Sequence, residues 1–403
     1  RDLKMASAAS YVETQSRPGA FWGLLAAGGL FLLAAFAAFL HFEHSGHVVT
    51  GMDNQIVWGM PHVFAVFLIV AASGVLNVAS IGSVFGKPMY KARAPLSGLL
   101  ALAMMAGGLA VLAADLGRPD RLIVAMTHFN FKSIFALNMM FYSGFFAIVA
   151  AYLVTLMDHS LNGYNKVIGF LAFFWRLALT TATGSIFGFL VARTAYGSAL
   201  MAPMFIIYSF AYGLAAFLIV QGSMYSWNGL QLDARILARM KNLLAVFVGA
   251  ALYFTAVMHL TSLYFAKQID YERFLLLDGG VYTLAFWLGQ VLIGGILPLV
   301  LLFAPGATQT RVIAASVLVV LGGLAQMFVT IVGGQAFPLE IFPGYAISSS
   351  FQDGIVNGYS PVIGEFALGF GAIALAFLIT VVAVPVLCFL PPDDFAALKA
   401  SDD

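Results

Sequence analysis

Long runs of apolar residues alternate with short polar connections along almost the whole chain. Each run has about 20 or more residues, and a helix of that length crosses a hydrocarbon core of about 30 Å. A helix also satisfies its backbone hydrogen bonds internally, as lipid requires. The pattern therefore predicts an all-α integral membrane protein with about ten spans, at residues 20–41, 58–84, 96–114, 133–157, 167–192, 202–222, 243–266, 281–303, 312–333 and 361–389.

The composition agrees with a membrane protein and excludes several other classes. Of the 403 residues, 62% are hydrophobic and 9% are charged, and so few charges cannot cover the surface of a soluble globule. The 19 basic and 18 acidic residues nearly balance, so we expect membrane lipid as the surroundings and no nucleic-acid partner. The single cysteine, Cys388, excludes an internal disulfide, a thiolate-held iron–sulfur cluster and a CxxCH haem attachment site.

The connections between the spans differ in charge from one side of the membrane to the other. The first apolar run is kept as a span because it exceeds the apolar core of a signal peptide, about 7–15 residues, and an even number of spans places both termini on one side. The connections on that side hold twelve lysines and arginines, and those on the opposite side hold six. The positive-inside rule then predicts a multi-pass protein with cytoplasmic termini and long outer connections.

Few ionisable residues lie within or beside the spans, and most of them gather near the outer face. His62 and Glu365 each lie about 6 Å below the outer end of a span at about 1.5 Å per residue, and His259 lies about 12 Å below. Such groups are expensive in lipid and usually face a cavity or another helix. The residues that share one membrane level are His62, Asp115, Arg118, His128 and Glu365.

Each of these residues also has a plainer structural interpretation. His62 could pair only with a neighbouring helix, and His259 could be satisfied by the hydroxyl residues beside it. Asp115 and Arg118 could form a salt bridge that fixes the turn after the third span. Arg176 lies nearer the cytoplasmic end of its span, and we expect its side chain to snorkel to that surface.

A site of this kind suits a molecule with an apolar tail and a head group that exchanges protons. A quinol fits, because its hydroxyls need acceptors and its two protons leave when its electrons do. Histidine has an ordinary pKa of about 6.5 and can accept a proton near neutral pH.

Two other functions compete with quinone chemistry. A single b-type haem could be held by His62 and His259, the histidines that lie well inside spans, whereas two stacked haems would need four such residues. A secondary transporter or proton channel would need ionisable groups deeper in the membrane, where few are found. A metal site on "HFEHSGH" (residues 41–47) is less favoured than a solvated loop, so no metal ligands are predicted.

Several motifs resemble those of the NrfD/polysulfide-reductase membrane-subunit family. They are "IVWGMPHVFAVFLIVAASG" at the second span, "ADLGRPDRL" closing the third, "FNFKSIF" before the fourth, "RTAYGSALMAP" after the fifth, and the outer connection "FPLEIFPGYAISSSFQDGIVNGYSPVIGE". The resemblance covers residues 55–390. The ten-span branch of the family includes the hydrogenase-2 membrane subunit and the DsrP subunit of a sulfur-metabolism complex.

The resemblance implies a fold, a cofactor and a partner. It implies two four-helix bundles with one extra span at each end, a menaquinone or ubiquinone bound near the outer face, and a periplasmic ferredoxin-like iron–sulfur subunit docked on the outer loops within a multi-subunit redox complex. The family's quinone-contacting histidine matches His62, but its partner, an asparagine three residues earlier, is replaced here by Gly59.

Other positions of the family site carry over less directly. Asp115 and Arg118 match the helix-end motif, and Arg193 stands where hydrogenase-type relatives have the second residue of a His-Gln pair. Tyr142 is a candidate quinone tyrosine because it lies on the adjacent fourth span.

We therefore predict a haem-free quinone-reactive membrane anchor without an iron–sulfur cluster of its own. His62, Asp115 and Arg118 would handle the quinone proton, with Arg118 holding the carboxylate ionised, and Tyr142, His128, Glu365 and Arg193 would line the site. Arg176, Asn138 and Gln326 are candidates for a proton path. The predicted division of the chain is 1–19 for a cytoplasmic tail, 20–57 for the extra span and its loop, 58–192 and 193–333 for the two bundles, and 334–403 for the long loop, tenth span and tail.

Overall fold

The structure, a computed structural model, describes residues 13–158, 160–306, 308–339, 342, 345 and 354–391. Within these ranges the chain is helical and contains no β-strand. Ten helical segments are long and apolar enough to cross a membrane, as the hydrophobic pattern predicts. The expected fold class is confirmed in these respects.

The first five spans come from the N-terminal half of the chain. After α1 (Pro18–Ser45), the spans are α2 (Met60–Ser83), α4 (Ala94–Ala114), α6 (Ile134–Met157) and α7 (Asn165–Gly188). The short helices α3 (Pro88–Lys91) and α5 (Leu122–Thr127) lie in the connections. Helix α2 is the centre of the protein, because it is almost wholly buried and packs against α4, α7 and α8.

The five remaining spans follow later in the chain. They are α8 (Met201–Trp227), α9 (Ala234–Tyr264), the segment Val281–Phe303, the segment Gln309–Ala336 and α15 (Ile363–Leu387). The segment Val281–Phe303 comprises α11 (Val281–Leu284), a π-helix and α12 (Leu297–Phe303), and Gln309–Ala336 comprises α13 (Gln309–Phe328), a π-helix and α14 (Gly334–Ala336). The short α10 (Ile269–Arg273) follows α9.

Glycines allow α2 and α8 to cross at very short range. A Cβ atom at Gly74 would overlap the backbone of Ser209, and a Cβ at Gly213 would overlap the backbone of Gly74. The two helices therefore touch backbone to backbone, which fixes the join between the early and late spans.

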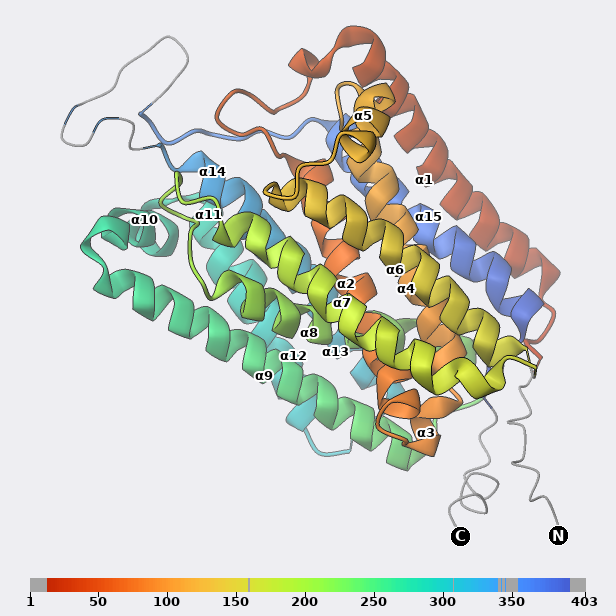
Figure 1. The fold of residues 1–403 in the computed structure, drawn as a ribbon. Coiled ribbons are helices and arrows are strands. Elements are labelled where there is room, and N and C mark those ends of the chain that lie inside the picture. Colours follow the sequence, from red (N-terminus) through yellow and green to blue (C-terminus); the bar gives the residue numbers. More distant parts are fainter. Residues whose placement is uncertain are drawn as a thin grey trace, which may run out of the picture.

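Figure 1 shows α1 and α15 side by side along one edge of the molecule and α9 along the opposite edge. The start of α1 and the end of α15 lie at the same end of the assembly. The other end, where α2 and α15 begin and α4 ends, is called the His62 face below.

Candidate functional site

His62 and Asp115 form a close ionic pair at the His62 face. His62 lies in the first turn of α2, whereas Asp115 is the C-cap of α4, so the antiparallel packing of these helices brings the two residues together. The imidazole Nδ1 lies 2.6 Å from Oδ2 of Asp115. The imidazole is 16% exposed and the carboxylate 1% exposed, so the pair joins the surface to the interior.

The Asp115 carboxylate has unused capacity to accept hydrogen bonds. Its Oδ2 lies 2.6 Å from His62 Nδ1, and neither of its oxygens accepts a hydrogen bond of regular geometry from the described residues. Buried polar atoms are normally satisfied, so an orphaned carboxylate marks a site where a donor is missing. The hydroxyl of a quinol head would be such a donor.

An aromatic wall lies beside the imidazole. The ring of Trp58 stacks on His62, with centroids 5.9 Å apart and planes 27° from parallel. Trp58 in turn contacts Phe135 of α6 at 5.8 Å and Phe187 of α7 at 6.0 Å. A proton-accepting group next to a flat apolar surface fits an aromatic head group, and these residues would hold one.

Glu365 is fully buried and accepts hydrogen bonds from residues that precede α15 and α2. Its Oε2 accepts from the amides of Val362 (2.8 Å) and Gly51 (3.0 Å), and its Oε1 accepts from the Tyr359 hydroxyl at 2.5 Å. The same hydroxyl accepts from the Met60 amide at 2.7 Å. Glu365 therefore organises the start of α2, two residues before His62.

The structure explains why Gly59 replaces the expected asparagine. A Cβ at this position would lie 2.5 Å from the Tyr359 hydroxyl, 2.7 Å from Glu365 Oε1 and 2.9 Å from Met52. The space that a side chain would need is occupied by Tyr359 and Glu365. Sequence reasoning did not select Tyr359, although a tyrosine six residues before a buried glutamate at the start of a span was a usable signal.

The expected pairing of Arg118 with Asp115 is wrong. Arg118 donates from Nε and Nη2 to Asp120 at 2.9 and 2.8 Å, and both side chains are largely exposed. Their hydrogen bond raises the pKa of Arg118 and lowers that of Asp120. Arg118 follows Asp115 by three positions, and the turn directs its side chain to the solvated Asp120 instead.

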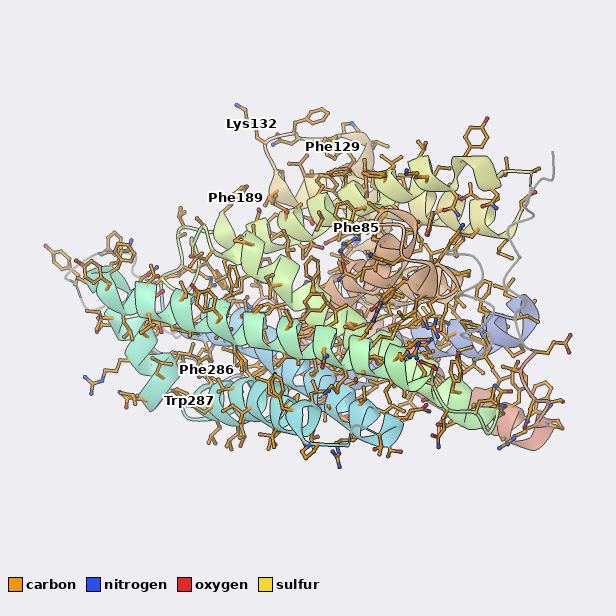
Figure 2. The ribbon with its side chains drawn as sticks, turned by 90° about the horizontal axis from the view of Figure 1, so that it is seen from below. Phe85, Phe129, Lys132, Phe189, Phe286 and Trp287 are labelled. Carbon is orange, nitrogen blue, oxygen red and sulfur yellow. The ribbon has the colours of Figure 1, made fainter. Side chains whose placement is uncertain are left out.

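His128 lies at the exposed end of α5, where its Nδ1 is 3.2 Å from the Thr127 hydroxyl. The connection that follows leads to α6, and Figure 2 shows Lys132 of this connection pointing away from the helices. His128 therefore belongs to the exposed margin of the His62 face.

Arg193 ties two backbone segments together. Its guanidinium donates to the carbonyl oxygens of Gln335 at 2.9 Å and Gln55 at 2.7 Å. The Gln335 side chain accepts from the amides of Val57 and Trp58. Burial lowers the pKa of Arg193. These contacts make Arg193 part of the support beneath Trp58.

Tyr142 lies deeper in the first group of spans. It is buried on α6, facing Thr183 of α7. Thr183 also donates to Asn138, one turn nearer the His62 face, at 3.2 Å.

A second buried histidine–carboxylate pair lies among the later spans. Nδ1 of His259 on α9 is 2.7 Å from Oε2 of Glu272 on α10, and both side chains are buried. The Phe286 ring packs edge-on against the imidazole at 4.9 Å, and Figure 2 shows Phe286 on the span Val281–Phe303. The expectation that local hydroxyl residues satisfy His259 is therefore wrong. The hydropathy pattern did not single out Glu272, because it lies in a connection between two spans.

A small polar cavity adjoins this second pair. It encloses about 20 Å³, enough for a single water molecule, and its lining includes Tyr196, His259, Glu272, Gln290 and Gln326. Residues from the π-helical segments Phe274–Asp278, Ala285–Ile296 and Val329–Gly333 line it, and π-bulges are frequent at functional sites.

Arg176 does not snorkel, contrary to the expectation. Its side chain is 1% exposed, and its guanidinium lies 5.0 Å from the Phe173 ring centroid and 5.5 Å from that of Phe210. Residues of α2 and α8 cover it. A hydropathy pattern does not show which helices pack against each other.

No group of three or more histidine, cysteine, aspartate or glutamate side chains that could hold a metal ion occurs in the part of the chain that the structure describes. The first two histidines of residues 41–47 lie in the last turns of α1 and are exposed, and His47 follows in a short 3₁₀ helix.

Comparison with known proteins identifies relatives over most of the chain. The chain is 28% identical over 351 residues to the Hdr-like menaquinol oxidoreductase integral membrane subunit of Archaeoglobus fulgidus, covering 85% of this chain and 87% of the relative. It is 27% identical over 400 residues to a putative dimethyl sulfoxide reductase membrane subunit of Halobacterium salinarum, covering 91% of each. It is 23% identical over 388 residues to a subunit of the selenate reductase of Mesobacillus selenatarsenatis, covering 85% of this chain and 88% of the relative.

The family model described as polysulphide reductase, NrfD, matches residues 48–339, a range that contains His62, Asp115 and the second pair His259–Glu272. The ten spans and the match over most of the sequence agree with the resemblance inferred from the motifs. The chain belongs to the NrfD polysulphide reductase family.

Proposed function

We propose that this chain is the quinone-reactive membrane subunit of a multi-subunit oxidoreductase and that a menaquinone or ubiquinone head binds at the His62 face. The observation that carries the proposal is the His62–Asp115 pair, a partly exposed imidazole held at 2.6 Å by a buried carboxylate. The names of the relatives support it, because they describe subunits of a menaquinol oxidoreductase and of two reductases.

The protein's own residues would handle one proton at the site. A bound quinone supplies chemistry in which two electrons and two protons are exchanged. His62 would accept or donate a proton through its imidazole, and Asp115 would orient the ring and stabilise its protonated form, as a carboxylate does for a histidine base. Trp58 and its aromatic neighbours would exclude water from one side.

The remaining predicted residues take supporting roles in this proposal. Glu365 and Arg193 hold the backbone that presents His62 and Trp58. Tyr142 and His128 stay predictions as lining residues, below and beside the pair. Arg118 has no assigned part in proton transfer, because its partner is Asp120.

The partner and the location are also proposals. Electrons would pass between the quinone and an iron–sulfur cluster of a ferredoxin-like subunit docked at the His62 face, and the chain would need no haem or cluster of its own. That face would be periplasmic in the inner membrane of a bacterium, with both termini in the cytoplasm. A complex of sulfur metabolism, as in the DsrP branch, would be one setting.

The decisive test is the variant His62→Ala in the intact complex. We expect quinol-dependent electron transfer to fall by at least about 100-fold, which is the lower range for loss of a general acid or base. Assembly and turnover with an artificial donor that reduces the partner subunit directly should be retained. The exposed His41 gives the control His41→Ala, and unchanged quinol turnover in His62→Ala would refute the assignment.

Two measurements on one purified sample separate this proposal from the haem and transporter interpretations. A reduced-minus-oxidised optical spectrum tests for haem, and solvent extraction with chromatography tests for bound quinone. Quinone without a b-type band supports the proposal. A b-type band lost in both His62→Ala and His259→Ala would turn the protein into a cytochrome, and neither haem nor quinone would favour a transporter.

A further inference from the structure

A column of buried polar residues lies between α2, α6 and α7, below the candidate site. Its members on α7 are Arg176, Thr180 and Thr183, which the spacings of four and three residues place on one face of the helix. The polar column is completed by Ser73 and Asn77 of α2 and by Asn138 and Tyr142 of α6, and all seven side chains are buried.

Hydrogen bonds connect the upper part of the polar column. Asn138 donates to the carbonyl oxygen of Ala182 at 3.1 Å, and Thr183 donates to Asn138 at 3.2 Å. One turn deeper, Thr180 donates to the Ser73 hydroxyl at 2.5 Å, and Ser73 donates to the carbonyl oxygen of Arg176 at 3.1 Å. Each of these two groups is hydrogen-bonded within itself, so hydroxyl and amide groups occur at two successive levels below the site.

Arg176 stands at the middle of the membrane in this column. It lies eleven residues after the start of α7 and twelve before its end, or about 16 and 18 Å at about 1.5 Å per residue. Asn77 lies one turn deeper than Ser73 on α2, just as Arg176 lies one turn deeper than Thr180 on α7, so antiparallel packing places the two residues at the same level.

The charge of Arg176 is uncompensated. Arginine stays protonated in proteins. Its Nε and Nη1 have no hydrogen-bond partner in the described part of the chain, and no ion pair with it is found there. The helices α2, α6, α7 and α8 contain no aspartate or glutamate. The guanidinium packs against the rings of Phe173 and Phe210.

A structural role alone does not account for this arrangement. A buried charge that stabilises a fold is normally paired, because removal from water is expensive and the partner offsets that expense. Here the guanidinium is held between two aromatic rings without a counter-ion among the described residues, at the deep end of the polar column.

We propose that Arg176 is a fixed positive charge that blocks proton passage through the first bundle, so that the candidate site exchanges protons with the His62 face alone. A proton approaching a cation in a low-dielectric interior meets strong repulsion, and positive charges exclude protons from membrane pores in this way. The claim that quinone protons exchange only with the His62 face rests on the function proposed above. The claim that Arg176 blocks proton passage does not depend on that function.

The test is passive proton flux across liposomes that contain the purified full-length chain and no quinone. A potassium gradient with valinomycin sets the membrane potential, and a trapped pH-sensitive dye reports the flux. We expect Arg176→Gln to raise the flux at least about tenfold over wild type, and Arg176→Lys to match wild type because the charge is kept. The matched control Arg311→Gln, which removes an arginine at the opposite face, should leave the flux unchanged.

A second variant keeps the proposal testable if Arg176→Gln does not fold, as judged by gel filtration and thermal unfolding. Asn77→Asp is nearly isosteric and leaves Arg176 in place while offering it a counter-ion, so it should also raise the flux. An unchanged flux in whichever of these variants is folded would overturn the proposal. So would an Arg176→Lys flux as high as that of Arg176→Gln, since packing and not charge would then form the barrier. Because no quinone is present, failure of the barrier and failure of the quinone function are separate results.

Discussion

The Tyr359 hydroxyl and the Glu365 carboxylate lie 2.5 Å apart, and this hydrogen bond joins the connection before α15 to the first turn of α2. Residues from opposite ends of the chain thus fix the position of His62. A head group that binds at His62 would be held by a frame that includes the tenth span, although that span supplies no residue of the His62–Asp115 pair.

Alkaline pH should weaken this frame. Burial and the neighbouring Glu365 carboxylate raise the pKa of Tyr359 above its usual value of about 10. The unfolded chain releases this proton near pH 10 and the folded chain does not, so the contribution of Tyr359 to stability is complete below about pH 10 and is lost as the pH rises toward the folded pKa. Thermal unfolding of wild type and Tyr359→Phe should differ by about 1.5–3 kcal/mol at pH 8 and by less at pH 11. A difference that grows with pH would contradict this sign.

Adding one methyl group at Gly59 should destabilise the protein. The Cβ of Gly59→Ala would press on the Tyr359 hydroxyl and on Glu365, and overpacking of this kind costs about 1–3 kcal/mol. Chemical or thermal unfolding in detergent measures the change. Gly358→Ala in the same outer region is the control, because nothing lies within 4 Å of its Cβ. Equal stability of the two variants would show that the Gly59 site can relax.

Neutralising Asp115 should slow quinol turnover without preventing assembly. The variant Asp115→Asn keeps the shape but removes the neighbouring negative charge that would stabilise a protonated His62. We expect quinol-dependent turnover of the complex to fall by about 10- to 100-fold. Asp278→Asn removes an exposed carboxylate paired with Arg273 and should stay near wild type. If Asp115→Asn turned over quinol at the wild-type rate, the prediction would be wrong, and His62 would not need the carboxylate.

The His259–Glu272 pair should matter more to stability than to turnover. Glu272→Gln removes the charge from a buried contact of 2.7 Å and should lower the free energy of unfolding by about 1.5–3 kcal/mol. Turnover per folded molecule should stay near wild type, because the pair is separate from the His62–Asp115 site. The control is Asp270→Asn, an exposed carboxylate on the same short helix. A stable but inactive Glu272→Gln would instead assign the second pair to catalysis.

The sequence predicted the spans well because span length and apolarity are local properties. It also placed His62 and Asp115 at one membrane level, since both lie at span ends. Contacts between side chains were harder to predict. Arg118 is three residues from Asp115 but points to Asp120, and Arg176 is covered by helices whose facing sides no pattern reveals.

The residues missed by sequence reasoning, Tyr359 and Glu272, lie outside the spans. Each folds back onto a partner in or beside a membrane helix: Tyr359 onto Glu365 and Met60, and Glu272 onto His259. A hydropathy pattern assigns such residues to solvated connections. Only the path of the connection shows that they are buried.

The pairing of α1 with α15 has a consequence for biosynthesis. Gly28 of α1 faces Leu378, and Gly371 of α15 faces Ala35, whereas little of α1 is otherwise covered. A ribosome delivers α1 to the membrane more than 300 residues before α15. The first span must therefore wait in lipid, without its partner, until the tenth has been synthesised. Maturation of the protein is completed late, and a nascent chain stalled before α15 would present an unpaired helix to the quality-control machinery of the membrane.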